Sequence, residues 1–474
     1  MARAVRPGER IHVIGIAGSG AAGTAVLLAD AGARVDGCDI DAESPYTPAL
    51  DAAGIRHVAG HDSAHLTGVD RVAITPALRS LAHHDELEAA EAARLPVATW
   101  QALLGGLMDE PGRLGLAVAG THGKSTTTAL LGHILVEAGL DPTVEVGAFI
   151  EAWGASVRPG RGAPFLVEAD EWGDNFLNYH PSIAIVTNVE MDHPDWFADR
   201  VAVLNSFERF VRGMTPDERV GGCLLLGAAA DPGADELTAR LGDWEGRILR
   251  YGSGGAMAAD AVSLTRRGSA FRLFEHQFEM ELAGEHNVLN ATAALIVGRE
   301  LGIPGATLGA GLRSFAGAGR RMELIADTAG VTVYDDYGHH PTEVRAAIAA
   351  ARQRVGAQRR LWAVFEPHMY SRTALLLDEF ATSFTDADEV AIVDIFASRD
   401  TPDAMRATSA EALADAIERV SAVPTIATGD DAQTADYLAD HVREGDAVLV
   451  MGAGRSYRIA RGLAARLAAE GVVS

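Results

Sequence analysis

Lys124 is the only lysine among the 40 lysine and arginine residues of this 474-residue chain. It lies in the glycine-rich run Ala119-Gly120-Thr121-His122-Gly123-Lys124-Ser125-Thr126-Thr127-Thr128. A lysine ammonium is a compact charge that can lie between the outer phosphates of a nucleotide, a task for which a planar guanidinium is less suited. Glycine lets backbone amides face phosphates, and the hydroxyl of Ser125 can bind magnesium. The run therefore predicts a nucleotide-phosphate loop.

The loop differs from the standard phosphate-loop motif, because two residues separate Gly120 from Gly123 where the standard motif has four. We expect Thr126 and Thr127 to add contacts to phosphate or within the first helical turn. The alternative is a glycine turn that contains a lysine by chance.

Two acidic runs follow apolar segments that read as strands. They are Glu168-Ala169-Asp170-Glu171 and Asn188-Val189-Glu190-Met191-Asp192-His193. Carboxylates at the carboxyl edge of a parallel sheet lie where such sheets bind ligands. One carboxylate of the first run together with Ser125 would suffice as protein ligands of magnesium, and His193 could bind a second metal or the reacting phosphate. Either run alone could instead be a solvated loop.

The run Gly284-Glu285-His286-Asn287-Val288-Leu289-Asn290 opens a helical pattern. His286 and Asn290 are four residues apart and share a helix face, which allows a contact with adenine or ribose. Asn287 could equally be a helix cap.

Polar runs also follow the expected strands of the last third of the chain. Arg320 or Arg321 could neutralise phosphate charge, and the run from Asp335 to Glu343 offers carboxylates and imidazoles for an amine nucleophile. Arg372 could bind a carboxylate bidentately. Each run alone could be an ordinary charged loop, but three of them at neighbouring strand ends indicate a site.

A second glycine-rich loop lies near the start of the chain, at Gly15-Ile16-Ala17-Gly18-Ser19-Gly20-Ala21-Ala22-Gly23. Such a loop can present amides to a pyrophosphate, and Asp39 is placed for a ribose hydroxyl. Taken alone, the loop favours NAD or FAD. Another nucleotide and simple strand–helix packing remain alternatives.

The elements that position these residues fall into three blocks, and their strand–helix alternation predicts mostly parallel sheets of the α/β class. The predicted strands are 10–16, 34–38, 71–74, 96–99, 114–119, 165–167, 183–187, 331–334, 361–365, 389–393 and 447–451. A small antiparallel sheet is expected within 248–282, and a helix over 287–301.

Composition excludes several classes of function. A net charge of −25 would repel nucleic acid and anionic membranes, so we expect neither as a partner. Cys38 and Cys223 are far apart and have neither metal-ligand nor disulfide spacing. We expect a protein of the reducing cytoplasm without a transmembrane segment.

In combination, these runs resemble the Mur ligases, the ATP-dependent enzymes that build the peptide of peptidoglycan. The resemblance covers nearly the whole chain and rests on the following segments in the family's order: the first glycine loop, 120–124, 168–171, 187–188, 192–193, 286–287, 320–321, 335–343 and 370–373.

The resemblance implies three domains: a Rossmann-like domain for the UDP-sugar over 1–105, a central ATPase domain over 106–317, and a Rossmann-like domain for the incoming amine over 318–474. It reassigns the first loop to the UDP pyrophosphate. The implied substrates are UDP-N-acetylmuramate, L-alanine and ATP with Mg²⁺, joined through an acyl phosphate by a monomer or homodimer.

The resemblance also carries residue roles. Lys124, His193, Arg320, Arg321 and His339 would be catalytic. The implied nucleotide contacts are Gly120, Thr121, His122, Gly123, Lys124, Ser125, Thr126, His286, Asn287 and Asn290. The implied metal ligands are Ser125, Glu168 and His193. The implied substrate contacts are Gly18, Ser19, Gly20, Asp39, Thr75, Tyr337, His340 and Arg372.

Some positions depart from the family pattern. Thr75-Pro76-Ala77 replaces a serine pair that contacts the UDP-sugar, Glu285 replaces an arginine, and Met369 replaces an arginine in the presumed acceptor domain. The alternatives are therefore a ligase that attaches a tripeptide to the same sugar and a divergent ligase with another acceptor. The alternatives outside the ligases are a nicotinamide-dependent dehydrogenase and a nucleotide-binding protein without catalytic activity.

Overall fold

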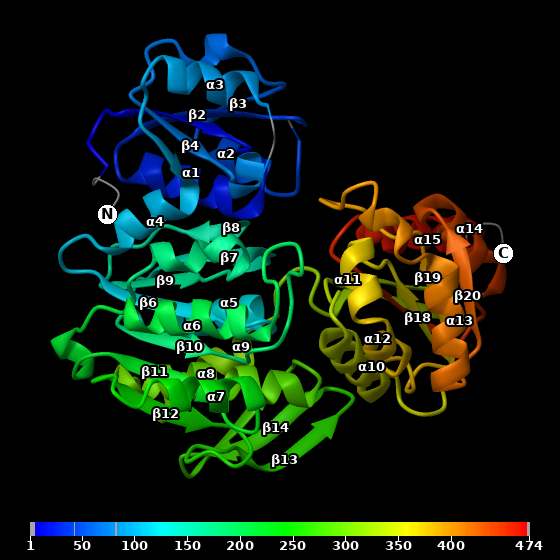
Figure 1. Cartoon of the computed structure of the whole chain (residues 1–474). Helices are drawn as coiled ribbons and strands as arrows, with labels where there is room; N and C mark the ends of the chain where they lie inside the picture. Colours follow the sequence, from blue (N-terminus) through cyan, green and yellow to red (C-terminus); the bar gives the residue numbers. More distant parts are fainter. Residues whose placement is uncertain (1–4, 42, 81–82, 472–474) are drawn as a thin grey trace. The chain divides into compact units, whose positions relative to one another are not determined.

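The computed structural model describes residues 5–41, 43–80 and 83–471 (Figure 1). It divides into two compact units. The first comprises residues 1–190, 201–259 and 290–318, and the second comprises 191–200, 260–289 and 319–474. No helix among the described residues is both long and apolar enough to span a bilayer.

A five-stranded parallel sheet begins the first unit, with the order β3-β2-β1-β4-β5. Its strands are β1 Arg10–Ile14, β2 Arg34–Asp39, β3 Arg56–Ala59, β4 Arg71–Ile74 and β5 Val97–Thr99. The helices around it are α1 Ser19–Asp30, α2 Thr47–Ala52, α3 Asp85–Ala92 and α4 Trp100–Met108, with α1 and α3 on opposite faces (Figure 1). The strands predicted here are confirmed, except that β1 ends two residues early.

The second sheet of this unit has seven strands in the order β12-β11-β10-β6-β9-β7-β8, and β8 alone is antiparallel to its neighbour. The strands are β6 Leu114–Ala119, β7 Thr143–Ile150, β8 Ala155–Arg158, β9 Pro164–Glu168, β10 Ile183–Val186, β11 Leu224–Ala228 and β12 Arg247–Tyr251. The helices are α5 Lys124–Glu137, α6 Arg200–Arg212, α7 Pro232–Arg240, α8 Glu285–Glu300 and α9 Gly305–Ser314.

The predicted antiparallel sheet is smaller than the segment 248–282. It consists of β13 Asp260–Thr265, β14 Gly268–Leu273 and β15 His276–Met280, in the second unit. The prediction was wrong for residues 248–251, because β12 pairs in parallel with β11. As the edge strand of its sheet, β12 is only partly buried and mixes polar with apolar residues, so it lacks the continuous apolar run of an inner parallel strand.

The second unit is built on a six-stranded sheet with the order β16-β17-β21-β18-β19-β20. Its strands are β16 Glu323–Thr328, β17 Val331–Asp336, β18 Leu361–Phe365, β19 Glu389–Val393, β20 Thr425–Gly429 and β21 Ala447–Met451. Its helices are α10 Pro341–Val355, α11 Tyr370–Leu375, α12 Leu377–Ala381, α13 Ala410–Ser421, α14 Asp431–His441 and α15 Ser456–Gly471. Only β16 runs antiparallel to its neighbour among the strand pairs described.

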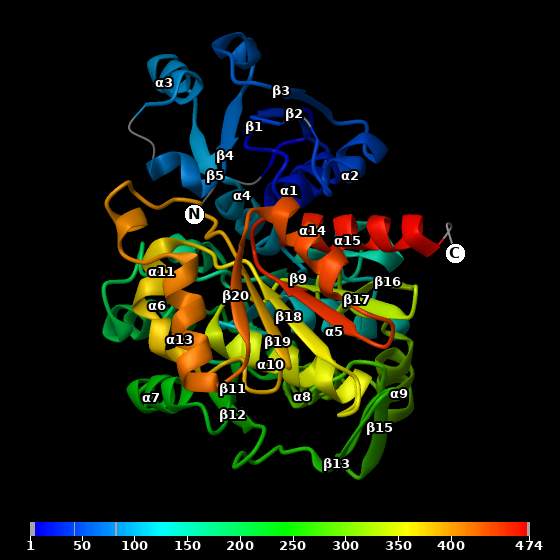
Figure 2. The ribbon, with the colours of Figure 1, turned by 90° about the vertical axis from the view of Figure 1, so that its right-hand side faces the viewer.

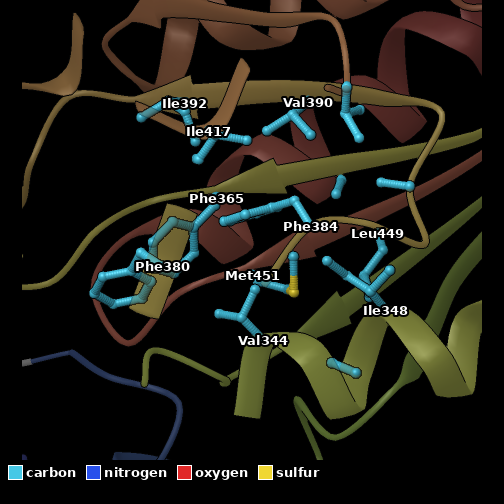
Figure 3. Packing of buried hydrophobic residues seen from close by; sticks show 14 of the residues in the cluster. Val344, Ile348, Phe365, Phe380, Phe384, Val390, Ile392, Ile417, Leu449 and Met451 are labelled. Carbon is cyan, nitrogen blue, oxygen red and sulfur yellow. The ribbon is translucent and has the colours of Figure 1, made fainter. Parts of the chain in front are cut away.

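Alternate residues of the central strands face opposite sides of this sheet, as a period of two requires. Phe365 and Leu449 point into a core with α10, α12 and α13 (Figure 3). Val364 and Val450 belong to a second core, which they form with residues of α14 and α15. These two helices are labelled side by side in Figure 2. Burial on both faces explains why β18 and β21 are continuous apolar runs, and it fixes the strand ends at which the predicted polar runs emerge.

Candidate active site

The predicted phosphate loop joins the buried strand β6 to α5. Gly120 has a φ of +126°, and Gly123 has a φ of +79° at the position that precedes the helix. These are conformations that side chains disfavour, and they explain the two glycines. Lys124, Ser125 and Thr126 form the first turn of α5, where backbone amides and the helix dipole favour an anion.

The ammonium of Lys124 is held over its own loop. Its Nζ donates to the backbone oxygen of Gly120 at 2.6 Å and that of Thr121 at 3.2 Å, and it pairs with Glu171 Oε2 at 2.9 Å. Burial alone would lower the pKa of Lys124, but Glu171 and Asp170 outweigh it and the pKa is raised. The lysine is therefore a permanent positive charge beside the backbone of the loop.

Ser125 and Glu168 meet beside the loop, as predicted. The Ser125 hydroxyl donates to Glu168 Oε1 at 2.9 Å, and Glu168 Oε2 accepts from the amide of Gly147 at 2.7 Å. Adjacent ligands of an octahedral magnesium with bonds of about 2.1 Å are about 3 Å apart, so this oxygen pair fits the ion. His193, the third predicted ligand, belongs to the second unit.

Glu145 is a buried carboxyl that the sequence did not single out. It lies on β7 beside β9, is 2% exposed, and its Oε2 has no hydrogen-bond partner among the described residues. Burial, reinforced by the charge of Glu168, raises the pKa of Glu145 well above its usual range. Glu145 is thus a neutral acid.

The strand end after β10 holds the loop in shape. Asn188 Oδ1 accepts from the amide of His122 at 2.8 Å, and the amide of Glu190 donates to Thr121 Oγ1 at 2.9 Å. The Thr187 hydroxyl donates to the backbone oxygen of His122. The backbone of His122 and the hydroxyl of Thr121 therefore anchor the loop.

Replacing Gly120 with alanine tests this packing. A Cβ at Gly120 would lie 2.1 Å from Thr187 Oγ1 and 2.9 Å from the Thr187 amide nitrogen. We expect nucleotide affinity to fall at least about tenfold, because displacing a positioning loop by about 1 Å is costly. Calorimetric titration with nucleotide measures the change. Gly139→Ala is the matched control, since Gly139 has a φ of +71° and nothing within 4 Å. Equal affinities in both variants would contradict the prediction.

The predicted nucleotide residues of α8 differ in what they contact. Asn290 lies against the loop, because a Cβ on Gly123 would be 2.6 Å from its Oδ1. Asn287 is not a helix cap, since α8 starts at Glu285, and its Nδ2 donates to the backbone oxygen of Ala283 at 2.7 Å. Burial and the charge of Arg321 lower the pKa of His286 to about 4, so its imidazole is neutral.

The first glycine loop has the predicted position at the carboxyl end of β1. The amides of Gly15 and Ile16 donate to the backbone oxygen of Cys38. Asp39 Oδ2 accepts from the amide of Ala17 at 2.9 Å, so this carboxylate holds the backbone of the loop in place.

The other predicted residues of this loop lie at the start of α1. Gly18 precedes the helix in an extended conformation, and Ser19 and Gly20 begin it. A Cβ on Gly20 would be 2.3 Å from the Trp100 ring, which explains that glycine. The methyl group of Thr75 lies 2.6 Å from where Gly15 would carry a Cβ.

In the second unit, Arg372 connects several predicted residues. Its Nε donates to Asp192 Oδ1 at 2.8 Å, its Nη1 lies 3.1 Å from His368 Nδ1, and its Nη2 lies 3.5 Å from His193 Nδ1. Arg372 is 1% exposed and Asp192 is 5% exposed. His193, predicted to be catalytic, thus lies beside a buried ion pair that the sequence did not reveal.

The two arginines just before β16, Arg320 and Arg321, have different partners. Arg320 donates to Asp335 Oδ2 at 3.0 Å, to the backbone oxygen of Gly452 at 2.7 Å and to Ser456 Oγ at 2.8 Å. Arg321 lies 3.7 Å from Glu343 Oε1, and both guanidinium groups lie over the Tyr337 ring. These contacts fix Arg320 within its own unit.

His339 and His340 directly precede α10, which begins at Pro341. His340 caps the helix, with its Nδ1 accepting from the amide of Thr342 and with Glu343 completing the capping box. His339 Nδ1 donates to the backbone oxygen of Tyr337 at 3.1 Å. Burial lowers the pKa of His339 to about 3, so its ring is neutral at pH 7.

This neutral imidazole should make the second unit sensitive to acid. The pKa of His339 is about 3 when folded and 6.5 when unfolded, so between these values only the unfolded state binds the proton. Stability is therefore lost as pH falls from 6.5 toward 3, by about 1–2 kcal/mol between pH 7 and pH 5. Urea unfolding at both pH values should show a smaller loss in His339→Gln. The control is His276→Gln, at an exposed position of β15. Equal losses in both variants would contradict the assignment.

Three domain models of one protein family match most of this chain. The Mur ligase family catalytic domain matches residues 10–111, the Mur ligase middle domain matches 167–298, and the Mur ligase glutamate ligase domain matches 320–454. A UDP-N-acetylmuramate–L-alanine ligase from Symbiobacterium thermophilum is 37% identical over 98% of this chain and 96% of its own.

Two solved structures are also similar. UDP-N-acetylmuramate–alanine ligase from Thermotoga maritima covers 97% of this chain and 99% of its own at a TM-score of 0.80 and 24% identity. A murein peptide ligase from Psychrobacter arcticus has the same coverage at a TM-score of 0.70 and 26% identity. The predicted fold class is confirmed.

Proposed function

This chain belongs to the Mur ligase family, and from that premise we propose that it joins the carboxylate of UDP-N-acetylmuramate to the amine of L-alanine at the expense of ATP. The product would be a precursor of peptidoglycan. The observation that carries the proposal is the site of Lys124, Ser125 and Glu168, which combines a fixed cation, backbone amides and magnesium ligands around one loop.

The first step would be phosphoryl transfer to the carboxylate. A carboxylate oxygen attacks the γ-phosphorus of ATP, the bond to ADP breaks, and an acyl phosphate forms. Lys124 and the first-turn amides of α5 would stabilise the charge that moves off the γ-phosphate. Ser125 and Glu168 would hold Mg²⁺, which neutralises charge on the phosphate oxygens.

The second step would be attack of the amine on the carbonyl carbon, which expels phosphate and releases one proton. Arg321 is suited to the phosphate charge, whereas a pKa of about 3 makes His339 a weak base for this proton. We assign the UDP-sugar to residues 1–105, ATP to 106–317 and the amino acid to 318–474. The acidic chain would act as a monomer or homodimer in the cytoplasm.

A second candidate is attachment of a whole tripeptide to the same sugar. The run from Asp192 to Phe197 favours it, and the murein peptide ligase fold is similar at 26% identity. Glu343 and the run from Tyr370 to Thr373 favour the alanine enzyme. Met369 is fully buried at the start of α11. Because it stands in place of an arginine of the family pattern, an acceptor other than L-alanine stays an alternative. A nicotinamide-dependent dehydrogenase would not need the Lys124 loop.

ADP release tests these candidates directly. The full chain is incubated with UDP-N-acetylmuramate, ATP and Mg²⁺, and L-alanine, L-serine, glycine and the tripeptide are supplied one at a time. L-alanine-dependent release is expected. ADP release only with another acceptor would support the ligase reaction but contradict L-alanine as the acceptor. No release with any acceptor would contradict the proposal.

A further inference from the structure

Four side chains that can bind a metal converge in the five-stranded sheet of the first unit. They are His12 on β1, Cys38 on β2, His65 in the short helix Ser63–Leu66, and Glu86 in the first turn of α3. One ligand atom from each lies within 4.8 Å of all the others. His12, Cys38 and Glu86 are at most 2% exposed.

The distances between these atoms are close to those around a bound ion. Glu86 Oε1 lies 3.0 Å from His12 Nε2 and 3.1 Å from His65 Nδ1. Cys38 Sγ lies 3.0 Å from Glu86 Oε2 and 3.4 Å from His12 Nε2. Tetrahedral zinc with bonds of about 2.0–2.3 Å places its ligand atoms about 3.3–3.8 Å apart. Small outward shifts would therefore open the site.

We propose that His12, Cys38, His65 and Glu86 form a zinc-binding site in the N-terminal sheet. Two imidazoles, a thiolate and a carboxylate are ligand types that zinc accepts together. The negative charges of Cys38 and Glu86 would balance a divalent ion, so the buried complex carries no net charge. This site is independent of the proposed ligase reaction.

The surroundings of His12 support this assignment. Its Nδ1 lies 2.6 Å from Asp36 Oδ1, which leaves Nε2 directed at the cluster. A carboxylate that orients a histidine through its second nitrogen is the usual outer partner of a metal ligand. His61 Nδ1 adds a further polar contact, 3.2 Å from both Cys38 Sγ and Glu86 Oε2.

The competing interpretation is a network of hydrogen bonds around Glu86 without metal. In that state Cys38 is a thiol, because burial and Glu86 raise its pKa. Burial lowers the pKa of His12, but hydrogen bonds to Asp36 and Glu86 outweigh this and raise it to about 9. Binding a divalent ion would displace two protons, one from Cys38 Sγ and one from His12 Nε2. The two states are therefore chemically distinct and can be told apart.

A bound ion would stabilise the first glycine loop by fixing the end of β2, which contacts this loop. The backbone oxygen of Cys38 accepts from the amides of Gly15 and Ile16, and the next residue, Asp39, holds the amide of Ala17. Fixing Cys38 to β1, His65 and α3 would thus fix the end of β2 that shapes the loop. We assign the ion a structural role.

Metal analysis and cobalt spectroscopy test the proposal on the full, untagged chain without nucleotide. We expect one zinc per chain by mass spectrometry. After removal of zinc, titration with Co²⁺ alone should produce a thiolate-to-cobalt absorption band. The chain has two cysteines, so Cys38→Ser should abolish this band and the control Cys223→Ser should keep it. Absence of both zinc and the band in the unaltered chain would overturn the proposal, as would a band that survives Cys38→Ser.

Two further variants test the site independently, in case the Cys38→Ser chain does not fold. Asp36→Asn removes only the outer partner and should weaken Co²⁺ binding about 10- to 100-fold. His65→Asn alters a half-buried ligand and should weaken it more than about a hundredfold. Circular dichroism checks that each variant is folded. Folded variants that bind Co²⁺ as the unaltered chain does would also overturn the proposal.

Discussion

Replacing Lys124 with alanine is expected to lower ATP-dependent turnover by about 10² to 10³-fold or more, the cost of removing one fixed charge from a site where charge develops. Its Nζ lies within hydrogen-bond distance of two loop carbonyls and of Glu171. A nucleotide would therefore meet an ammonium already in place. ADP release under saturating substrates measures the loss in kcat.

Lys124→Arg is the matched variant, because it keeps the charge and changes only its shape. We expect it to remain at least about tenfold below the unaltered chain, since a planar guanidinium cannot replace a compact ammonium in a tight loop. Thermal unfolding should confirm that both variants are folded. Full activity in a folded Lys124→Ala chain would contradict the assignment of the loop.

Replacing Arg372 with alanine is expected to destabilise the second unit by about 3–5 kcal/mol, because it leaves a buried carboxylate without its partner. The remaining charge would be on Asp192, whose pKa is lowered well below its usual range by His193 and Arg372 against the opposing effect of burial. Urea unfolding followed by circular dichroism measures the change.

A double variant separates the ion pair from simple packing. Asp192→Asn combined with Arg372→Met removes both charges and should recover most of the stability that Arg372→Ala loses. Arg466→Ala is the control, because Arg466 and Asp436 form an exposed pair and such pairs contribute about 1 kcal/mol or less. A loss as large in the control as in Arg372→Ala would contradict the buried-pair interpretation.

In the six-stranded sheet, sequence patterns predicted the central strands well and the edge strands poorly. The bounds predicted for β18, β19 and β21 match the structure, because burial on both faces makes these strands continuous apolar runs. The edge strands β16 and β20 were missed. They are partly exposed and rich in polar residues, so they lack that signal.

The grouping of residues around the candidate phosphate loop could be predicted because they are adjacent in sequence or end neighbouring strands. Ser125 meets Glu168 for this reason. The role of Glu171 as the partner of Lys124 and the neutral state of Glu145 depend on packing, which no local motif encodes.

The zinc-site residues were invisible for a different reason. His12, Cys38, His65 and Glu86 come from four separate elements, with no short spacing between any two. Cys38 was set aside on spacing alone, and only the pairing of β1 with β2 brings it beside His12.

Following oxygen-18 from the substrate carboxylate tests the acyl-phosphate route most directly. UDP-N-acetylmuramate labelled in both carboxylate oxygens is turned over with ATP, Mg²⁺ and L-alanine, and the released phosphate is analysed by phosphorus NMR. If the carboxylate attacks the γ-phosphorus at the Lys124 loop, each phosphate carries one labelled oxygen. Unlabelled phosphate, formed at the same rate as the amide, would contradict the mechanism.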